Sequence, residues 1–156
     1  MLLRSTLKTP IGALSLISRE HILLAAGFAS HETLLPGLSR VDQESDFKKS
    51  NELPIITELL KDYFDGDLAA LNAISVRQPG AAFSQAAWKA MKKVKAGKVI
   101  SYGELAERAG SPAAVRAAGS ACAKNAIVLV VPCHRIVKTG GALGNYAYGL
   151  DKKEWL

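Results

Sequence analysis

The hydrophobic period of this chain changes along its length, and that change limits the folds it can adopt. Over the first 28 residues, beginning at Leu2, the pattern alternates with the two-residue period of a strand. The segment 9–12, Thr-Pro-Ile-Gly, predicts a turn because proline fixes φ and glycine permits a positive φ. Two further strands are expected over residues 13–18 and 22–26. The chain is therefore predicted to begin with a β-rich segment.

A helical period replaces this alternation from Pro54 onward. The apolar stripe of the expected helix comprises Ile55, Ile56, Leu59, Leu60, Tyr63 and Phe64. Gly66 ends it, as a C-terminal cap would. The polar residues 29–52 predict an irregular surface loop, and residues 66–80 predict a connector. We expect two domains, residues 1–78 and 79–156.

Charge is divided unevenly along the 156 residues. Residues 1–77 carry 8 Lys and Arg against 10 Asp and Glu, or −2, whereas residues 78–156 carry 12 against 4, or +8. The basic half suits a polyanion such as nucleic acid, although solubility alone would also account for it. No stretch approaches the ~18–20 unbroken apolar residues of a membrane span. The N-terminus lacks a secretory pattern, so we expect a cytoplasmic protein with no membrane partner.

The cysteines and histidines do not form a metal-binding pattern. Cys122 and Cys133, together with the three histidines, contain no C-x-x-C and no H-x-x-x-H pair. The sequence therefore predicts no structural zinc site and no metal ligands. In a reducing cytoplasm the two cysteines are expected to be free thiols.

The second half is predicted to be mainly helical. Apolar residues at positions 83, 87, 91 and 94 share one side of its first helix, which Gly97 ends. The lysines at 89, 92, 93 and 95 lie mostly on the other side, as a solvated face or a DNA contact. Ser101 to Glu104 has the form of a capping box, and that helix stops at Gly110. Ser111-Pro112 is expected to start another helix, which completes a helix-turn-helix pattern.

Residues 113–121, the expected second helix of this pattern, are nearly all small. A helix that reads base edges in the major groove normally offers several long polar side chains, whereas this one offers only Arg116. Small side chains allow close approach to a narrow groove read by shape. The alternative is an alanine-rich core helix with Arg116 in solvent.

A continuous apolar run, residues 127–131, predicts a strand buried on both faces that leads into Pro132-Cys133-His134-Arg135. Cys133 is a candidate nucleophile, because a histidine can take the proton of a thiol and Arg135 adds positive charge. In an extended chain Cys133 and His134 would point to opposite sides, so their cooperation requires a break in the strand or a bridging water. A buried inert cysteine is the alternative. Cys122 is expected to serve packing, and a final helix is expected from Gly149.

Several segments together resemble the O6-alkylguanine-DNA alkyltransferase family, specifically over residues 83–156 and faintly over 1–77. They are Pro132-Cys133-His134-Arg135-Ile136-Val137, Gly97-Lys98-Val99-Ile100-Ser101-Tyr102, Val115-Arg116-Ala117, Asn125, Gly144-Asn145-Tyr146, Lys153-Glu154-Trp155-Leu156 and Thr9-Pro10-Ile11-Gly12. The resemblance implies an α+β fold, with an N-terminal ribonuclease-H-like α/β domain and a C-terminal, mainly helical domain that carries the helix-turn-helix. It implies no cofactor, and the zinc ligands of some family members are absent here.

The resemblance also implies irreversible repair, in which an alkyl group moves from O6 of guanine, or O4 of thymine, to Cys133. His134, Tyr102 and Asn125 would complete the catalytic set. A monomer would bind double-stranded DNA through the minor groove, with the damaged nucleotide flipped into the protein. Arg116, Tyr102, Ala117 and Arg135 would contact DNA. The pocket for the alkylated base would be lined by Ile136, Tyr146, Ala147 and Tyr148.

One departure from the family leaves a second function open for this chain. The family relay runs from a glutamate through the histidine and a water to the cysteine, and its glutamate lies about one helical turn beyond Leu156. Glu154 matches a different family position. An alkylated-DNA-binding protein with weak or no transfer is therefore the main alternative. A helix-turn-helix regulator is disfavoured by the lack of base-reading side chains, and a cysteine hydrolase by the lack of an acyl-transfer site.

Overall fold

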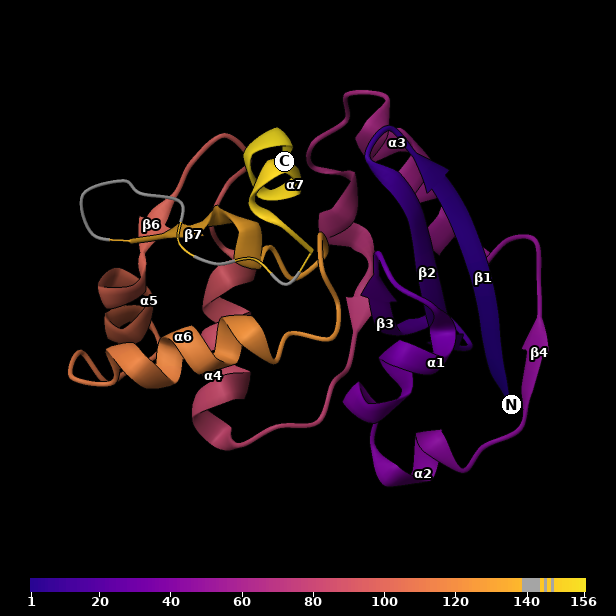
Figure 1. Ribbon diagram of the computed structural model, residues 1–156, viewed down its shortest axis with the longest axis horizontal. Coiled ribbons are helices and arrows are strands. Elements are labelled where there is room, and N and C mark those ends of the chain that lie inside the picture. Colours follow the sequence, from indigo (N-terminus) through magenta and orange to yellow (C-terminus); the bar gives the residue numbers. More distant parts are fainter. Residues whose placement is uncertain (139–143, 145, 147) are drawn as a thin grey trace. The chain divides into compact units, whose positions relative to one another are not determined.

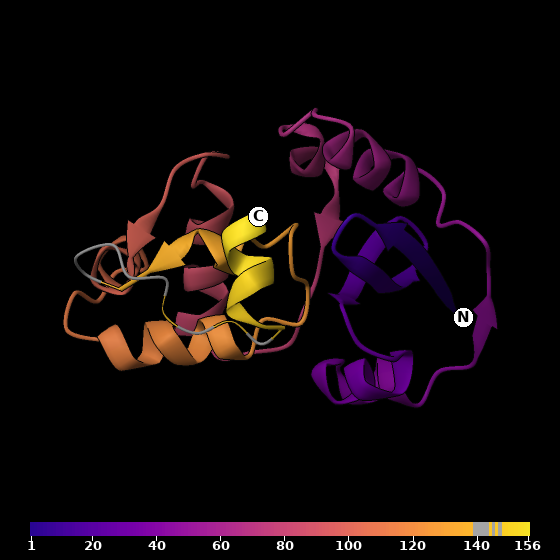
Figure 2. The ribbon, with the colours of Figure 1, turned by 45° about the horizontal axis from the view of Figure 1, so that its top comes forward.

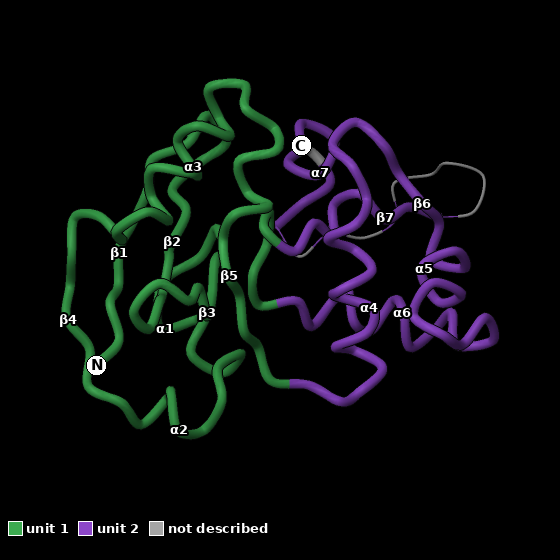
Figure 3. Tube along the Cα trace, turned by 180° about the vertical axis from the view of Figure 1, so that it is seen from behind, with its two compact units in different colours: residues 1–79, 126–130 green, residues 80–125, 131–156 purple. Residues whose placement is uncertain are grey.

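The computed structural model describes residues 1–138, 144, 146 and 148–156. It divides into two compact units that are described separately below (Figure 3). Unit 1 contains Met1–Pro79 and Ala126–Val130, and unit 2 contains Gly80–Asn125 and Val131–Leu156. The fold mixes sheet and helices. None of the helices in the described residues is both long and apolar enough to cross a membrane.

Unit 1 is built on a five-stranded sheet of order β4-β1-β2-β3-β5 (Figure 1). The central strands β1 (Leu2–Thr9), β2 (Gly12–Arg19) and β3 (Ile22–Gly27) are antiparallel, which confirms the three predicted strands. Their first turn has Gly12 at φ 126°. The short edge strands β4 (Phe47–Lys49) and β5 (Ser75–Val76) pair in parallel with β1 and β3.

Helices cover both faces of this sheet. Figure 2 shows α3 (Ile56–Phe64) on one face, with α1 (His31–Leu34) and α2 (Arg40–Gln43) on the other. The cover explains why five consecutive residues of β2 are buried rather than alternate ones. The 3-10 turns Leu35–Gly37 and Ala70–Ala73 complete the helical cover.

The prediction of an irregular loop over residues 29–52 is wrong in part. Ser30 and Ser39 cap α1 and α2 by accepting hydrogen bonds from the backbone N–H groups of Thr33 and Asp42. The expected helix after Pro54 is present, but it begins at Ile56. Ile55 has a φ of 69° and is 63% exposed, so it does not belong to the buried stripe.

The predicted strand over residues 127–131 is not formed, although all five residues are buried. Only one β-bridge forms, between Ile127 and Ala26, and the chain then passes through turns with Leu129 at φ 72°. The Ala126 N–H donates to the Gln78 side chain at 2.9 Å, which helps to hold this returning segment in unit 1. The sequence predicted the burial of the run but not its conformation, because an apolar run has no period that separates a strand from a buried turn.

Unit 2 packs α4 (Ala82–Lys92), α5 (Tyr102–Arg108) and α6 (Val115–Ala123) against one another. The Trp88 indole N–H donates to the carbonyl of Ala121 at 2.9 Å and so joins α4 to α6. β6 (Ile100–Ser101) and β7 (Ile136–Val137) form a short parallel pair. A 3-10 turn (Cys133–Arg135) precedes β7, and α7 (Leu150–Trp155) follows it, close to the predicted last helix.

The start of α5 agrees with the sequence, whereas the start of α6 does not. Ser101 caps α5 by accepting a hydrogen bond from the Glu104 N–H at 3.0 Å, and Gly110 follows the helix at φ 98°. The prediction that Ser111 caps the next helix is wrong. Residues 111–114 form a turn instead, and α6 begins two residues later than expected, at Val115.

Candidate active site

The candidate nucleophile Cys133 lies in the 3-10 turn that replaces the predicted strand end. Its backbone N–H donates to the carbonyl of Val131 at 2.9 Å, and its side chain is buried. His134 follows in the same turn and is also buried. Because the backbone is not extended here, the geometry that would place the two side chains on opposite sides does not apply.

The environment of Cys133 acts on its pKa in two directions. Burial raises the pKa of the thiol, while a hydrogen bond from the Asn125 side chain and the charge of Lys153 lower it. The Asn125 amide also donates to the carbonyl of Val131 at 2.7 Å, two residues before the cysteine. Asn125 therefore joins the end of α6 to the segment that carries the nucleophile.

His134 has an unusual environment for a proton acceptor. Burial, followed by the charges of Arg135 and Lys153, lowers the pKa of the ring to about 3. Neither ring nitrogen has a hydrogen-bond partner among the residues that the structure describes. The ring is therefore neutral at neutral pH and, with these neighbours alone, a weak base.

Lys153 is a site residue that sequence reasoning missed. It is buried on α7, and its ammonium lies 5.9 Å from the centroid of the Tyr102 ring. Burial lowers the pKa of the lysine, whereas the two cysteines raise it. A lysine near the end of an expected helix looks like a solvent-exposed residue, so no pattern in the sequence indicated its burial.

Tyr102 is the first residue of α5 and is half-buried. Gly144, at φ 70°, passes close to it, since a Cβ at this position would lie 2.9 Å from the Tyr102 hydroxyl. Tyr102 is thus brought together with Lys153 and the segment after β7. Only a residue without a side chain fits that approach.

The residues expected to line a base pocket are only partly described. Ile136 is fully buried in β7. The rings of Tyr146 and Tyr148 meet edge to face with centroids 6.1 Å apart. Burial, and then the charge of Cys133, raise the pKa of Tyr148. This side chain therefore lies close enough to the nucleophile to interact with it electrostatically. Ala147 lies outside the described residues.

The residues expected to contact DNA occupy two settings. Arg116 and Ala117 are exposed on α6, whose Ala118 and Ala121 are buried. Arg135 instead donates from its guanidinium to the carbonyl of Val94 at 2.7 Å, so it packs against the end of α4.

Cys122 is distinguished from Cys133 by its own electrostatics. It lies on α6, and burial, with the charge of Cys133, raises its pKa to about 12. Lys153 opposes this only weakly, so Cys122 remains a thiol at neutral pH. Of the two cysteines, Cys133 is the better candidate nucleophile.

Comparison with known proteins shows that nearly all of this chain is similar to methylated-DNA–protein-cysteine methyltransferases. Residues 82–156 match the profile of the DNA-binding domain of 6-O-methylguanine DNA methyltransferase. A methylated-DNA–protein-cysteine methyltransferase of Salmonella typhimurium is 41% identical over 101 residues, which is 65% of this chain and 59% of that protein. The protein of the same name from Mycolicibacterium paratuberculosis is 35% identical over 157 residues, covering 97% of this chain and 87% of the relative.

A solved structure shares the fold at similar coverage. The crystal structure of Mycobacterium tuberculosis OGT in complex with DNA superimposes with a TM-score of 0.79 at 28% identity, over 97% of this chain and 88% of that one. Unit 2, which carries Cys133, contains all of the segment that matches the DNA-binding profile except residues 126–130, which belong to unit 1.

Proposed function

This chain belongs to the methylated-DNA–protein-cysteine methyltransferase family, and we propose that it repairs alkylated DNA by transferring the alkyl group of O6-alkylguanine to Cys133. O4-alkylthymine is a second substrate of the same chemistry. The observation that carries the proposal is the setting of Cys133, a thiol whose pKa is raised by burial, an effect that Asn125 and Lys153 oppose, within the segment that matches the family.

The transfer is a single displacement. The thiolate of Cys133 attacks the alkyl carbon, the bond between that carbon and O6 breaks, and a thioether forms. The thiol proton passes to His134, and the guanine takes a proton from the Tyr102 hydroxyl as the bond between O6 and the alkyl carbon breaks, so that O6 stays on the base. Tyr102 supports that protonation, since its ring lies beside the Lys153 ammonium. The thioether is stable, so each molecule acts once.

DNA binding is assigned to unit 2, with α5 and α6 as a helix-turn-helix. The exposed face of α6 carries Arg116 and Ala117, and its small residues suit close approach to the minor groove. The damaged nucleotide rotates out of the duplex at a cost of a few kcal/mol, and Arg116 offsets part of this cost by filling the gap. The protein acts as a monomer, and unit 1 is the ribonuclease-H-like domain.

A damage-binding protein with slow transfer is the competing function. The feature in its favour is His134, with its pKa of about 3 and no hydrogen-bond partner for either ring nitrogen in the described part of the chain. A weak base leaves the thiol proton in place and slows the displacement.

The two functions differ in what happens to the DNA. Duplex DNA containing O6-methylguanine is incubated with excess protein and then digested to nucleosides. With the wild type and with Cys122→Ser, the O6-methylguanine should be converted to guanine. With Cys133→Ser, the DNA should retain its O6-methylguanine. Tight binding of all three proteins without any loss of O6-methylguanine would favour the damage-binding function instead.

A further inference from the structure

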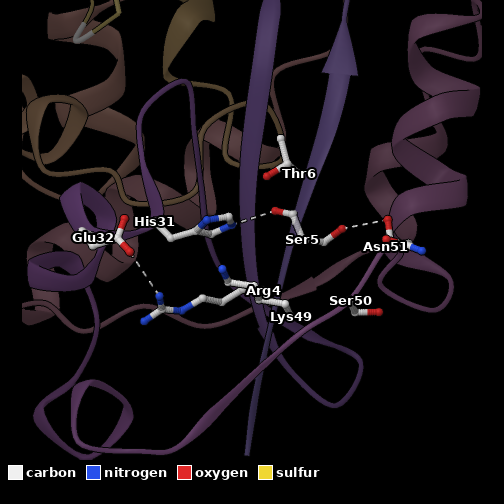
Figure 4. Close-up of a pocket in the computed structure, with 8 residues that line it drawn as sticks. All are labelled: Arg4, Ser5, Thr6, His31, Glu32, Lys49, Ser50 and Asn51. Atoms are coloured by element: carbon white, nitrogen blue, oxygen red, sulfur yellow. Dashed lines mark hydrogen bonds and ion pairs between the residues drawn. The ribbon is translucent and has the colours of Figure 1, made fainter.

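A pocket in unit 1 gathers cationic side chains at the edge of the sheet, and the proposed repair reaction does not use it. The pocket has a volume of about 480 Å³. Arg4 of β1, Lys49 of β4 and His31 of α1 contribute to its lining (Figure 4). Three elements that are distant in the sequence thus supply basic groups to one space.

The strand register places two of these cations side by side. β1 and β4 are parallel, and Arg4 and Lys49 are paired positions in the ladder. Like charges on paired strand positions repel one another. Arg4 is nevertheless held in place, since its side chain is only 9% exposed and its guanidinium carbon lies 3.5 Å from the centroid of the Phe47 ring.

The protein neutralises this charge incompletely. A carboxylate oxygen of Glu32 lies 3.6 Å from a terminal nitrogen of Arg4, which is beyond good hydrogen-bond distance, and the Glu32 side chain is 76% exposed. An exposed ion pair of this kind contributes little to stability. The Arg4 Nε is buried and has no hydrogen-bond partner among the described residues. Among the residues that line the pocket, one exposed carboxylate, that of Glu32, therefore balances the two cations Arg4 and Lys49, and a buried donor of Arg4 remains unsatisfied.

Neutral donors complete the lining. The Thr6 hydroxyl and the Asn51 amide belong to exposed residues that border the pocket. The His31 ring is fixed by donating from Nε2 to the carbonyl of Ser5 at 2.8 Å, because a carbonyl can only accept, so this N–H orients the ring and is not offered to a ligand. Cations and polar donors in this arrangement suit the oxygens of a doubly charged anion.

We propose that this pocket binds the phosphate group of a small phosphorylated molecule. Its volume falls within the range of roughly 300–1,000 Å³ that is typical of small-molecule sites and exceeds what a phosphate alone needs. The surrounding sequence disfavours a nucleic acid backbone as the ligand, because residues 1–77 have a net charge of −2. A single phosphate group interacts with the local cations and, unlike a nucleic acid backbone, carries no further phosphates that the negative charge of unit 1 would repel.

Calorimetric titration of the full chain with inorganic phosphate tests the site. Lys49→Met should weaken binding about tenfold, since a charge-assisted contact is lost. The matched control is Lys48→Met, which removes the same charge from the neighbouring, oppositely directed position of β4 and should leave the affinity unchanged. Glu32→Gln should tighten binding, because the competing carboxylate is removed. Lys49 is preferred to Arg4 as the test position because it is exposed, so its loss spares the fold.

Three results would overturn the proposal. They are an absence of phosphate binding at millimolar concentrations, equal effects of Lys48→Met and Lys49→Met, and weaker binding by Glu32→Gln. A parallel titration with undamaged duplex DNA distinguishes the source of the phosphate. DNA affinity should respond equally to the two lysine variants, whereas a selective loss in Lys49→Met would reassign the site to the DNA backbone.

Discussion

At the scale of single residues, the chemistry of this protein depends on how a buried thiol is kept reactive. Cys133 is buried, and burial holds the pKa of its thiol above the usual value. Asn125, just after α6, and Lys153, on α7, oppose that effect from either side of Cys133 in the sequence. The cationic contribution comes from a lysine that is itself almost wholly buried. The reactivity of the site therefore depends on residues beyond the Cys-His pair.

Lys153→Met should slow methyl transfer by about tenfold at neutral pH, because the ammonium that favours the thiolate is removed. Lys153 lowers the pKa of Cys133, so its loss raises that pKa and moves the rate profile to higher pH. Transfer rates measured across a pH series would show the displacement. Lys152→Met, which removes a charge one residue earlier on α7, should keep the wild-type profile. Identical profiles for both variants would assign Lys153 a purely structural role.

His134 should make the protein less stable in acid. Its pKa is about 3 in the folded state, against about 6.5 in the unfolded chain. As the pH falls below about 6.5, the unfolded state binds the proton first, and stability declines until about pH 3. Near pH 5 this amounts to about 2 kcal/mol in the free energy of unfolding.

Urea unfolding at about pH 8 and about pH 5 checks this value. The loss between the two conditions should be smaller by about 2 kcal/mol in His134→Gln than in the wild type. His21→Gln, at an exposed position, should behave as the wild type does. A His134→Gln curve parallel to the wild-type curve would show that the ring does not titrate in this way.

At the scale of elements, α6 links the DNA and the chemistry. Its exposed face carries Arg116, while the asparagine just beyond its end, Asn125, contacts the cysteine segment. Arg116→Ala should therefore slow transfer from O6-methylguanine in duplex DNA by roughly ten- to a hundredfold, because no side chain then fills the gap that the flipped nucleotide leaves in the duplex. Transfer from the free base O6-benzylguanine, which needs no flipping, should be nearly unchanged. Equal losses on both substrates would instead mean that Arg116 supports the fold.

The elements differ in how far the sequence predicts them. β1 to β3 are predictable because the Thr-Pro-Ile-Gly turn and the short apolar runs on either side of the next turn act locally. α2 and the short strand β4 are not, since residues 29–52 are polar and their order comes from serine caps and pairing with β1. The run 127–131 is buried as predicted, but tertiary contacts rather than a local period set its backbone.

The residues of the candidate site also differ in how far the sequence predicts them. Cys133, His134 and Tyr102 could be named from their motifs, because their chemistry is visible in the residue types. Lys153 could not, because its burial follows from how α7 packs. The contact between Gly144 and Tyr102 was also invisible, since it joins segments about forty residues apart in the sequence. Ala147 stays a prediction.

At the scale of the whole molecule, the charge division should govern DNA binding. The second half carries +8, and several of its lysines, including Lys89, Lys93 and Lys95, are exposed. Affinity for undamaged duplex should fall steeply with salt, because each neutralised phosphate releases counterions. Undamaged sequences should differ little in affinity, since α6 offers few groups that read bases. A flat salt response, or a preference above about a thousandfold for one sequence, would favour a regulator instead.

The central claim is that Cys133 keeps the alkyl group, and intact-protein mass spectrometry tests it most directly. After incubation with an excess of duplex DNA containing O6-methylguanine, each protein molecule should gain one methyl group and no more. Peptide sequencing should locate it on Cys133. A methyl group on Cys122, or methylated DNA that is repaired while the protein mass stays unchanged, would contradict the account.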